Sequence, residues 1–331
     1  MEINENLIND GTSISKIKSN FILKILFENL KLKRVLKIII HNKHIQNRLN
    51  KGIIDYKNYF QIEIEIIPVN NTEGKFINFN NFKKTDFHIY FNNDTKELKR
   101  NTIYKDEKIN KIYIKIDKKK NQSFSGLFGS IKIIKKITFI KFYRTDINNM
   151  SCMFEGCSSL EELNFKNFMT DNVNDMNSMF KGCKSLKELN LNNFYTKNVT
   201  DMSNMFYGCK SIKELNLNNF NTSNVIYMSS MFRDCKSLNK LIISNFNTRN
   251  VIEMNYMFSN CSKLIKLNIS NFNTMNVINM NGMFSNCASL KILNILNLST
   301  ASSENNNNFF DNCISLKYLI CADKRINNIL K

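Results

Sequence analysis

Cysteines carry the most reactive side chains of this sequence, and seven of them recur at a constant interval of 26 residues. Thiolates bind zinc and act as nucleophiles, so a regular series of them could form a metal site or a redox array. Metal sites, however, take ligands at short spacing, and only Cys152 and Cys157 come close to such a pair. The seven are Cys157, Cys183, Cys209, Cys235, Cys261, Cys287 and Cys313.

The neighbours of these cysteines favour packing over chemistry. Met-Phe precedes six of the seven, from Met153-Phe154 to Met283-Phe284, and leucines follow each one. The total of nine cysteines is odd, which argues against a complete disulfide framework. We therefore expect free, buried thiols that fill small apolar sites in a reducing compartment. The methionines are predicted to be core residues, and no metal or cofactor is expected.

The remaining reactive groups do not combine into a catalytic site. His41 and His44 are three residues apart, as metal ligands on a helix can be, but no Cys, Asp or Glu lies nearby to complete a site. The third histidine, His88, stands alone, and the sequence has no glycine-rich phosphate loop and no Ser-His arrangement. We predict that the protein is not an enzyme and has no catalytic residues.

A strict 26-residue period predicts stacked units, none of which can bury its apolar side alone. The segment "LKELNLN" alternates apolar and polar residues, which predicts a strand with Leu189 and Leu191 inward. An Asn- and Thr-rich turn follows, and Met and Phe then return at the spacing of a short helical or 3₁₀ segment. The predicted fold class is α+β: a solenoid of parallel strands and short helical segments with a small N-terminal α+β cap.

The repeat continues upstream in altered form, with Ile131 in the position of the cysteines. An isoleucine there indicates that the position requires an apolar filler. We expect "KIYIKID", from residue 111, to be the first strand and the degenerate "ISLKYLICADKRINNIL" to close the stack. The predicted domains are therefore residues 1–110, a helical and β cap region, and residues 111–331, the solenoid.

One asparagine and one threonine recur in every unit. A binding residue would vary between units that face different parts of a partner, so these are predicted to be structural ladders that satisfy backbone groups in neighbouring coils. The threonines run from Thr170 to Thr300, and the asparagines are Asn167, Asn193, Asn219, Asn245, Asn271 and Asn297.

The outer face of the predicted strands varies between units, which makes it the candidate for binding a partner. One position changes from acidic to basic to apolar along the chain, and the position two residues later is mostly asparagine. A merely solvated sheet face is the alternative interpretation. The candidate partner-binding residues are Glu162, Glu188, Asn190, Glu214, Asn216, Lys240, Ile242, Lys266, Asn268 and Tyr318.

The repeat resembles a known family. The pattern C-x-x-L-x-x-L-x-L-x-x-F-x-T-x-x-V-x-x-M-x-x-M-F is similar to the BspA-like leucine-rich repeats of bacterial surface proteins and many unicellular eukaryotes. The resemblance implies a right-handed leucine-rich-repeat solenoid that binds proteins or mediates adhesion. Bacterial members usually carry export signals or wall anchors, and this sequence shows neither. A protein-interaction scaffold is thus the leading hypothesis, with a surface or secreted adhesin as an alternative.

The first 110 residues are expected to cover the exposed first edge of the solenoid. Amphipathic helices are predicted within residues 19–50, and strands at "QIEIEIIPV", "KFINF" and "DFHIYFN", followed by a hairpin turn at Asn92 to Asp94. The helices resemble an F-box, the module that docks onto a ubiquitin-ligase scaffold, although its usual Pro and Trp are absent. The region is therefore either a plain cap or the docking module of a substrate adaptor.

The formal net charge of +19 invites a nucleic-acid hypothesis. Residues 151–331 hold 18 Lys+Arg and 13 Asp+Glu, a net +5, which leaves +14 for residues 1–150. The abundance of Asn, Lys and Ile indicates compositional bias with solvated lysines instead, so nucleic acid is not an expected partner. Lysines interrupt the longest apolar stretches, so no membrane span is expected, and no secretory signal is predicted. We expect a cytoplasmic protein, with surface display or secretion without a recognisable signal as the alternative.

Overall fold

The structure is a computed structural model of the chain, and it divides into two compact units, Met1–Gln61 and Ile62–Lys331. It describes residues 17–20, 42–49, 61–79, 82–117, 122–142, 144, 146–166, 168–303 and 305–329. In the first unit, helix α4 (Lys43–Arg48) begins at Asn42, whose side chain accepts a hydrogen bond from the Ile45 amide. Most of residues 19–50, including His41, lie outside the described residues, so the F-box hypothesis stays a prediction.

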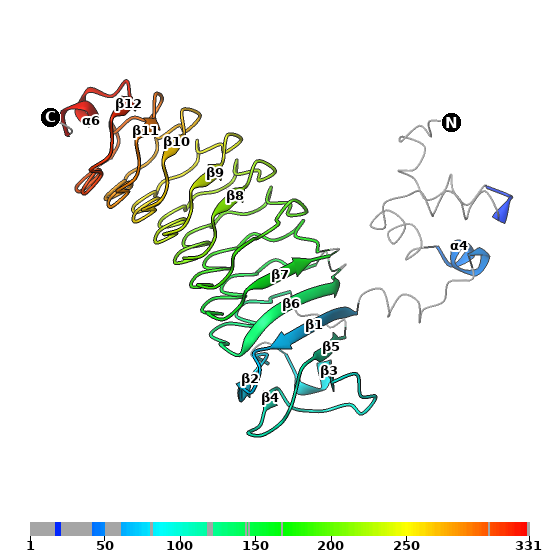
Figure 1. Ribbon diagram of the computed structural model, residues 1–331. Coiled ribbons are helices and arrows are strands. Elements are labelled where there is room, and N and C mark those ends of the chain that lie inside the picture. The colour runs from blue at the N-terminus through cyan, green and yellow to red at the C-terminus, as the bar shows by residue number, and fades with distance from the viewer. Residues whose placement is uncertain are drawn as a thin grey trace. The chain divides into compact units, whose positions relative to one another are not determined.

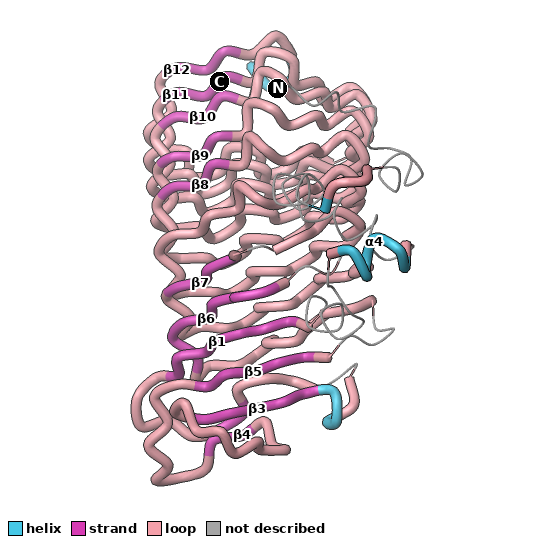
Figure 2. The backbone as a smooth tube through the Cα atoms, turned by 90° about the vertical axis from the view of Figure 1, so that its right-hand side faces the viewer, coloured by secondary structure: helices cyan, strands magenta, loops and turns pink. Residues whose placement is uncertain are grey.

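The second unit is a β-solenoid whose coils stack along one axis (Figure 1), as the 26-residue period predicted. Its repeated strands are short and lie on one side of the stack (Figure 2). Paired strands are parallel with partners 26 residues apart, as Leu215 and Leu241 are. The strands are β6 (Ile134–Lys141), β7 (Glu162–Phe165), β8 (Glu214–Asn216), β9 (Lys240–Ile242), β10 (Lys266–Asn268), β11 (Ile292–Asn294) and β12 (Tyr318–Ile320).

Antiparallel strands cover the first edge of this stack. They are β1 (Ile62–Pro68), β3 (Phe87–Phe91) and β5 (Ile112–Ile116), in a five-stranded sheet of order β3-β5-β1-β6-β7. Because β1 pairs with β6, the first solenoid strand does not present an unpaired edge. The segment expected to be the first solenoid strand is β5, but β5 is antiparallel to both neighbours, so that expectation was wrong. Alternation alone reveals a strand and not its direction.

The remaining elements of this region are small. They are β2 (Gly74–Lys75), β4 (Thr102–Ile103), which pairs with β2, and the 3₁₀ helix η2 (Lys84–Asp86). The predicted hairpin turn is confirmed, because Asn92 and Asn93 have positive φ and Leu98 bridges back to β3. Contacts group residues 62–110 with the repeats. The boundary expected at residue 110 therefore falls inside that unit, between the non-repetitive sequence and the repeats.

The Met-Phe segment of each coil is a pair of β-turns and not the predicted helical or 3₁₀ segment. In one coil the amide of Met153 bonds to the carbonyl of Met150, and Cys152 has a φ of 53°. The next turn places Gly156 at a φ of 71°. These left-handed residues direct amides along the stack, and Phe154 N bonds to Met179 O of the next coil at 2.9 Å. A helix would retain such bonds within the segment, so pairing between coils excludes it.

Pairing between coils is continuous along this turn segment and interrupted on the strand side. Single bridges connect successive coils from Asn149 and Asp175 onward to Asn305. On the strand side, residues 188–190 form no strand, and β9 does not pair with β10. The strand ladder is therefore divided into short blocks.

The core is a set of columns, each with one residue per coil. The phenylalanines of the Met-Phe pairs are fully buried, and rings such as Phe180 and Phe206 stack with centroids 5.6–5.7 Å apart. The stack ends in helix α6 (Lys324–Ile329), whose Ile326 is buried. Before it, the Asp323 carboxylate accepts bonds from the amide and hydroxyl of Thr300. No helix among the described residues is both long and apolar enough to cross a membrane.

Candidate functional site

The cysteine ladder makes hydrogen bonds between coils as well as packing contacts. Each thiol of the ladder donates to the carbonyl of the phenylalanine 29 residues earlier, at 3.0–3.2 Å, as Cys157 does to Phe128. All nine cysteines are free. Burial raises the pKa of Cys157 and of Cys209 to about 12, so these thiols stay protonated and can donate. They therefore hold coils together and are not poised as nucleophiles.

The threonine ladder lies buried between coils, and its hydroxyl groups both donate and accept hydrogen bonds. Thr222 Oγ1 donates to the carbonyl of Asn247 at 2.9 Å and accepts from the Asn247 amide at 2.7 Å. The same pair of bonds joins Thr248 to Asn273. The threonines from Thr170 to Thr274 thus satisfy the backbone of the next coil, where a turn offers no strand partner.

The asparagine ladder reaches back to the preceding coil. Asn219 Nδ2 donates to the carbonyls of Leu191 at 2.9 Å and Phe194 at 3.2 Å, although Asn219 as a residue is exposed. Asn245, Asn271 and Asn297 donate in the same way to the preceding coil. Asn193 is exposed in the same register, and Asn167 lies outside the described residues.

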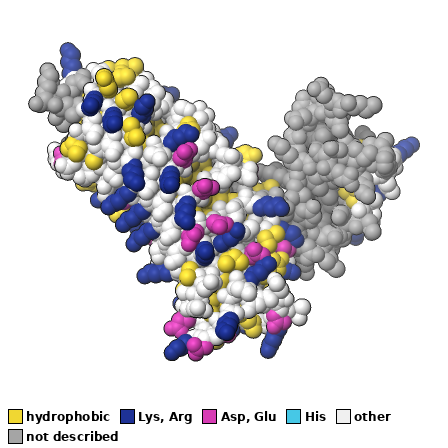
Figure 3. Space-filling model, viewed as in Figure 1, with side chains coloured by type: hydrophobic (Ala, Val, Ile, Leu, Met, Phe, Trp, Pro, Cys, Tyr) yellow, Lys and Arg dark blue, Asp and Glu magenta, His cyan; other side chains and the backbone are white. Residues whose placement is uncertain are grey.

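The ten candidate binding residues all lie along the strand side of the solenoid. Eight are on β7, β8, β9, β10 or β12, and Glu188 and Asn190 belong to the unpaired segment 188–190. Nine of the ten are exposed, and Ile242 is half-buried. This is the side that faces the viewer in Figures 1 and 3. The structure thus places the candidates on one continuous face.

The asparagines of this face have a local structural task that the sequence did not reveal. The Oδ1 atoms of Asn190, Asn216 and Asn268 each accept a bond from the backbone amide two residues later, at 3.0–3.1 Å. Such bonds fix the turn that follows a strand. Each Oδ1 thereby uses one of its two acceptor sites, so these residues offer a partner less than the sequence indicated.

The charged residues of the face form few and weak internal pairs. Glu214 pairs with Lys240 at 3.2 Å, and both side chains are more than half exposed. Glu162 pairs with Lys136 at 2.6 Å, and this bond lowers the pKa of Glu162. Exposed pairs of this kind contribute at most about 1 kcal/mol. Glu188, Lys213 and Lys266 have no ion pair among the described residues.

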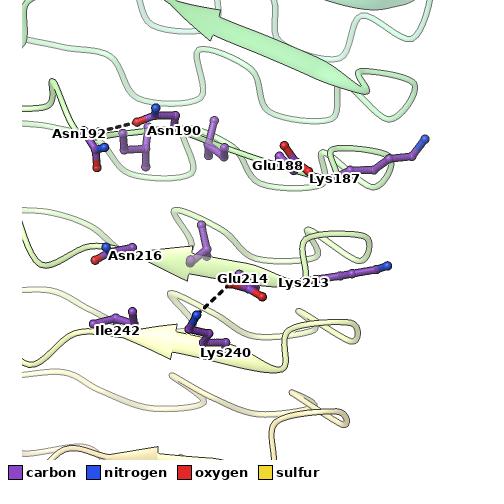
Figure 4. Close-up of a pocket in the computed structure, with 12 residues that line it drawn as sticks. Lys187, Glu188, Asn190, Asn192, Lys213, Glu214, Asn216, Lys240 and Ile242 are labelled. Carbon is purple, nitrogen blue, oxygen red and sulfur yellow. Dashed lines mark hydrogen bonds and ion pairs between the residues drawn. The ribbon is translucent and has the colours of Figure 1, made fainter.

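A groove of about 630 Å³ opens in the middle of this face (Figure 4). It lies where residues 188–190 leave the strand ladder, and the side chains of Leu189, Leu215 and Ile242 supply apolar surface. Six of the ten candidates line it, namely Glu188, Asn190, Glu214, Asn216, Lys240 and Ile242. Sequence reasoning missed Lys187, Lys213 and Asn192. The sequence could have indicated these residues, because each belongs to the segment "KELNLN", which occurs at residues 187–192 and 213–218.

Side-chain character changes along the stack. Figure 3 shows acidic side chains mainly in the middle and the capped part of this face and few towards the end that carries β12, whereas basic side chains occur along its whole length. Seven of the most exposed large apolar side chains belong to the later coils: Ile265, Met275, Ile278, Leu296, Ile314, Tyr318 and Ile320. The gradient predicted from sequence is therefore present on the surface.

One further polar cluster lies in the cap. His88 has Glu97 at 2.9 Å from Nδ1 and Asp117 at 3.0 Å from Nε2, so each ring nitrogen faces a carboxylate. His44 is exposed on α4. No group of three or more His, Cys, Asp or Glu side chains in the part of the chain that the structure describes could hold a metal ion. The described part of the cap thus holds a histidine between two carboxylates and no group of side chains that could hold a metal ion.

The repeats match a family model described as "Mycoplasma protein of unknown function, DUF285", over residues 122–216 and 209–321. The chain belongs to the DUF285 family. The match confirms the resemblance to BspA-like repeats. All residues that line the groove lie within the DUF285 repeats.

Comparison with solved structures and curated proteins adds little to this assignment. A leucine-rich repeat protein from Bacteroides ovatus, solved at 1.19 Å, is similar at 19% identity with a TM-score of 0.36. The similarity covers 63% of this chain and 60% of that one, so it spans less than two thirds of that protein. No curated protein matches the sequence.

Proposed function

We propose that this member of the DUF285 family is a non-enzymatic scaffold that binds another protein through its strand face. The observation that carries the proposal is the contrast between constant and varied positions. The cysteine, threonine and asparagine ladders are engaged between coils, whereas the charged column of the strand face changes from coil to coil. Exposed side chains that differ from coil to coil, held on a regular solenoid, can bind a partner selectively.

The charges of this column suit recognition better than stabilisation. Removing an exposed, weakly paired charge changes the free energy of unfolding little. A charge on the facing surface of a partner, however, would attract or repel that side chain. Glu188 and Lys266 are free of internal ion pairs among the described residues, so their charges are available. The groove between them adds apolar contact area at the centre of the face.

The test is a combined reversal of Glu188, Glu214, Lys240 and Lys266, which leaves the net charge unchanged. Partners that co-purify with the wild-type chain are identified and purified, and their binding is measured by calorimetry. We expect at least about tenfold weaker binding by the variant, with an unchanged melting temperature. A matched control reverses four exposed charges elsewhere: Lys184, Lys210, Glu73 and Asp311. Equal affinity of the wild-type chain and the strand-face variant would refute the proposal.

No observation on the described residues favours an F-box-like adaptor, an adhesin or a nucleic-acid binder. The cytoplasmic location likewise stays a prediction. Imaging a tagged full-length chain tests the location, and a ligase scaffold among the co-purifying proteins would revive the adaptor hypothesis.

A further inference from the structure

The charged column of the strand face is antisymmetric over its four central coils. Two acidic residues, Glu188 and Glu214, are followed by two basic ones, Lys240 and Lys266. The change of sign falls between β8 and β9, which are directly paired with Glu214 opposite Lys240. Turning the stack end to end therefore exchanges every acid of these four coils with a base.

We propose that two copies of this chain associate through their strand faces, with the two stacks antiparallel. The two-fold axis runs parallel to the strands, between β8 and β9. This operation brings Glu214 opposite Lys240 of the second copy, and Glu188 opposite Lys266 of the second copy. An interface of this isologous kind uses the same patch twice, so each contact occurs twice. The inference rests on the proposed function and names a second copy as a partner.

The columns beside the charged one are compatible with this arrangement. Asn190 faces Asn268 of the second copy, where Nδ2 of one side chain can donate to Oδ1 of the other, which keeps an acceptor site beside its turn bond. In the column that precedes the charged one, Lys213 faces Asn239 of the second copy, and Lys187 faces Ile265. No two like charges therefore meet at the same register in the four central coils.

The size of the face suits a specific dimer. A segment of six residues, such as 187–192, is about 20 Å wide at about 3.3 Å per residue. Six coils at about 4.8 Å per paired coil extend about 29 Å. The product is on the order of 600 Å² per copy, or about 1,200 Å² in total, which is the lower limit for a specific interface.

The pair between Glu214 and Lys240 within one copy does not prevent this association. Its side chains are 63% and 60% exposed, so water screens the pair and little is lost when they turn towards a second copy. At the two-fold axis the two glutamates and two lysines alternate, which lets every carboxylate contact a lysine from each copy.

The experiment measures the mass of the full-length chain by sedimentation velocity over a concentration series at low and high salt. We expect a dimer that weakens as salt is raised, because exposed charges are screened. Variant E188K/E214K makes the column wholly basic, and variant K240E/K266E makes it wholly acidic. Each variant alone should dimerise at least about 100-fold more weakly, since like charges then face each other. An equimolar mixture of the two should form a heterodimer.

The fourfold reversal separates this inference from the proposed function. It restores an antisymmetric column, so it should dimerise like the wild-type chain while it loses a foreign partner. A wild-type chain that stays monomeric, or two double variants that do not combine, overturns the dimer. Neither result touches the binding of a foreign partner, which the calorimetry tests separately. Because the mixture requires two folded chains, a heterodimer also shows that both double variants fold.

Discussion

Two stretches of this protein have the same sequence and different structures. Residues 187–192 and 213–218 both read Lys-Glu-Leu-Asn-Leu-Asn. The second contains β8, which pairs with β9, whereas the first contains no strand. Leu215 is buried, while its counterpart Leu189 is half-buried, although both belong to the lining of the groove. Local propensity is equal in the two stretches, so it cannot be the cause of the difference.

The two stretches differ in the coil that precedes each of them. The coil before residues 187–192 has Phe165 at an inward position where the coil before β8 has Leu191. The Phe165 ring lies 5.0 Å from Phe194 and 6.2 Å from Phe180, centroid to centroid, so it packs against the following coil. A ring in this register does not by itself exclude strand pairing, because Phe139 of β6 and Phe165 of β7 are directly paired. The contact between Phe165 and Phe194 nevertheless distinguishes the coil before the unpaired segment from the coil before β8.

The strongest test compares the two equivalent leucines. Leu215→Ala empties a buried site between paired strands and should lower the free energy of unfolding by about 2–4 kcal/mol. Leu189→Ala removes a half-buried side chain and should cost about 1 kcal/mol. Urea unfolding of both variants measures the difference, and equal losses would contradict the contrast between the two coils.

The asparagine ladder offers the next largest effect. Asn219→Ala removes the side-chain amide that donates to the carbonyls of Leu191 and Phe194. Both carbonyls belong to the coil that lacks strand pairing. We expect a loss of about 1–3 kcal/mol, because the Phe194 carbonyl loses its donor and the Leu191 carbonyl keeps only the bond from the Phe194 amide. The exposed Lys210→Ala should cost almost nothing in the same denaturant melts. Similar, small effects in both variants would show that water replaces the asparagine.

Replacing the ring tests whether the Phe165 contact causes the contrast. Phe165→Leu gives residues 187–192 the same kind of neighbour that β8 has, at a cost of about 1 kcal/mol in lost ring contacts. Hydrogen exchange at the Leu189 and Asn190 amides should slow by about tenfold, the equivalent of one added hydrogen bond. The amides of β8 should be unaffected and serve as the internal control. Unchanged exchange at Leu189 would reject Phe165 as the cause.

The smallest effect is expected from the surface pair. Lys240→Gln removes the partner of Glu214 and should change the free energy of unfolding by less than about 1 kcal/mol. Lys266→Gln, which removes a lysine without an ion pair among the described residues, should change it still less. Thermal melts at low and high salt measure both. A large loss for Lys240 would mean that the strand face stabilises the fold instead of serving recognition.

Much of the fold followed from sequence because the repeat constrains it so strongly. Seven cysteines in register could only mean coils that place the same residue on the same column, and alternation around Leu215 and Leu241 identified strands. The turn segment was harder to predict. Its left-handed positions hold Ser178, Asn204 and Tyr256 as well as glycine. Serine and tyrosine do not favour positive φ, so the sequence carried no consistent turn signal there.

The candidate face was also predicted in part. Sequence placed Glu188 and Lys240 on one exposed face, and the structure gathers them at one groove. It did not reveal that Asn190 caps a turn or that Cys157 donates to a carbonyl, because both bonds depend on where backbone groups lie in three dimensions.

The sequence by itself determined the coil length, the columns of the core and the order of charges along the face. Each of these depends only on which residue recurs every 26 positions, since every coil must fit the next. Tertiary structure alone decided which coils pair as strands and where the groove opens. Two identical segments diverge because strand pairing depends on the adjacent coils, and these differ in sequence and packing.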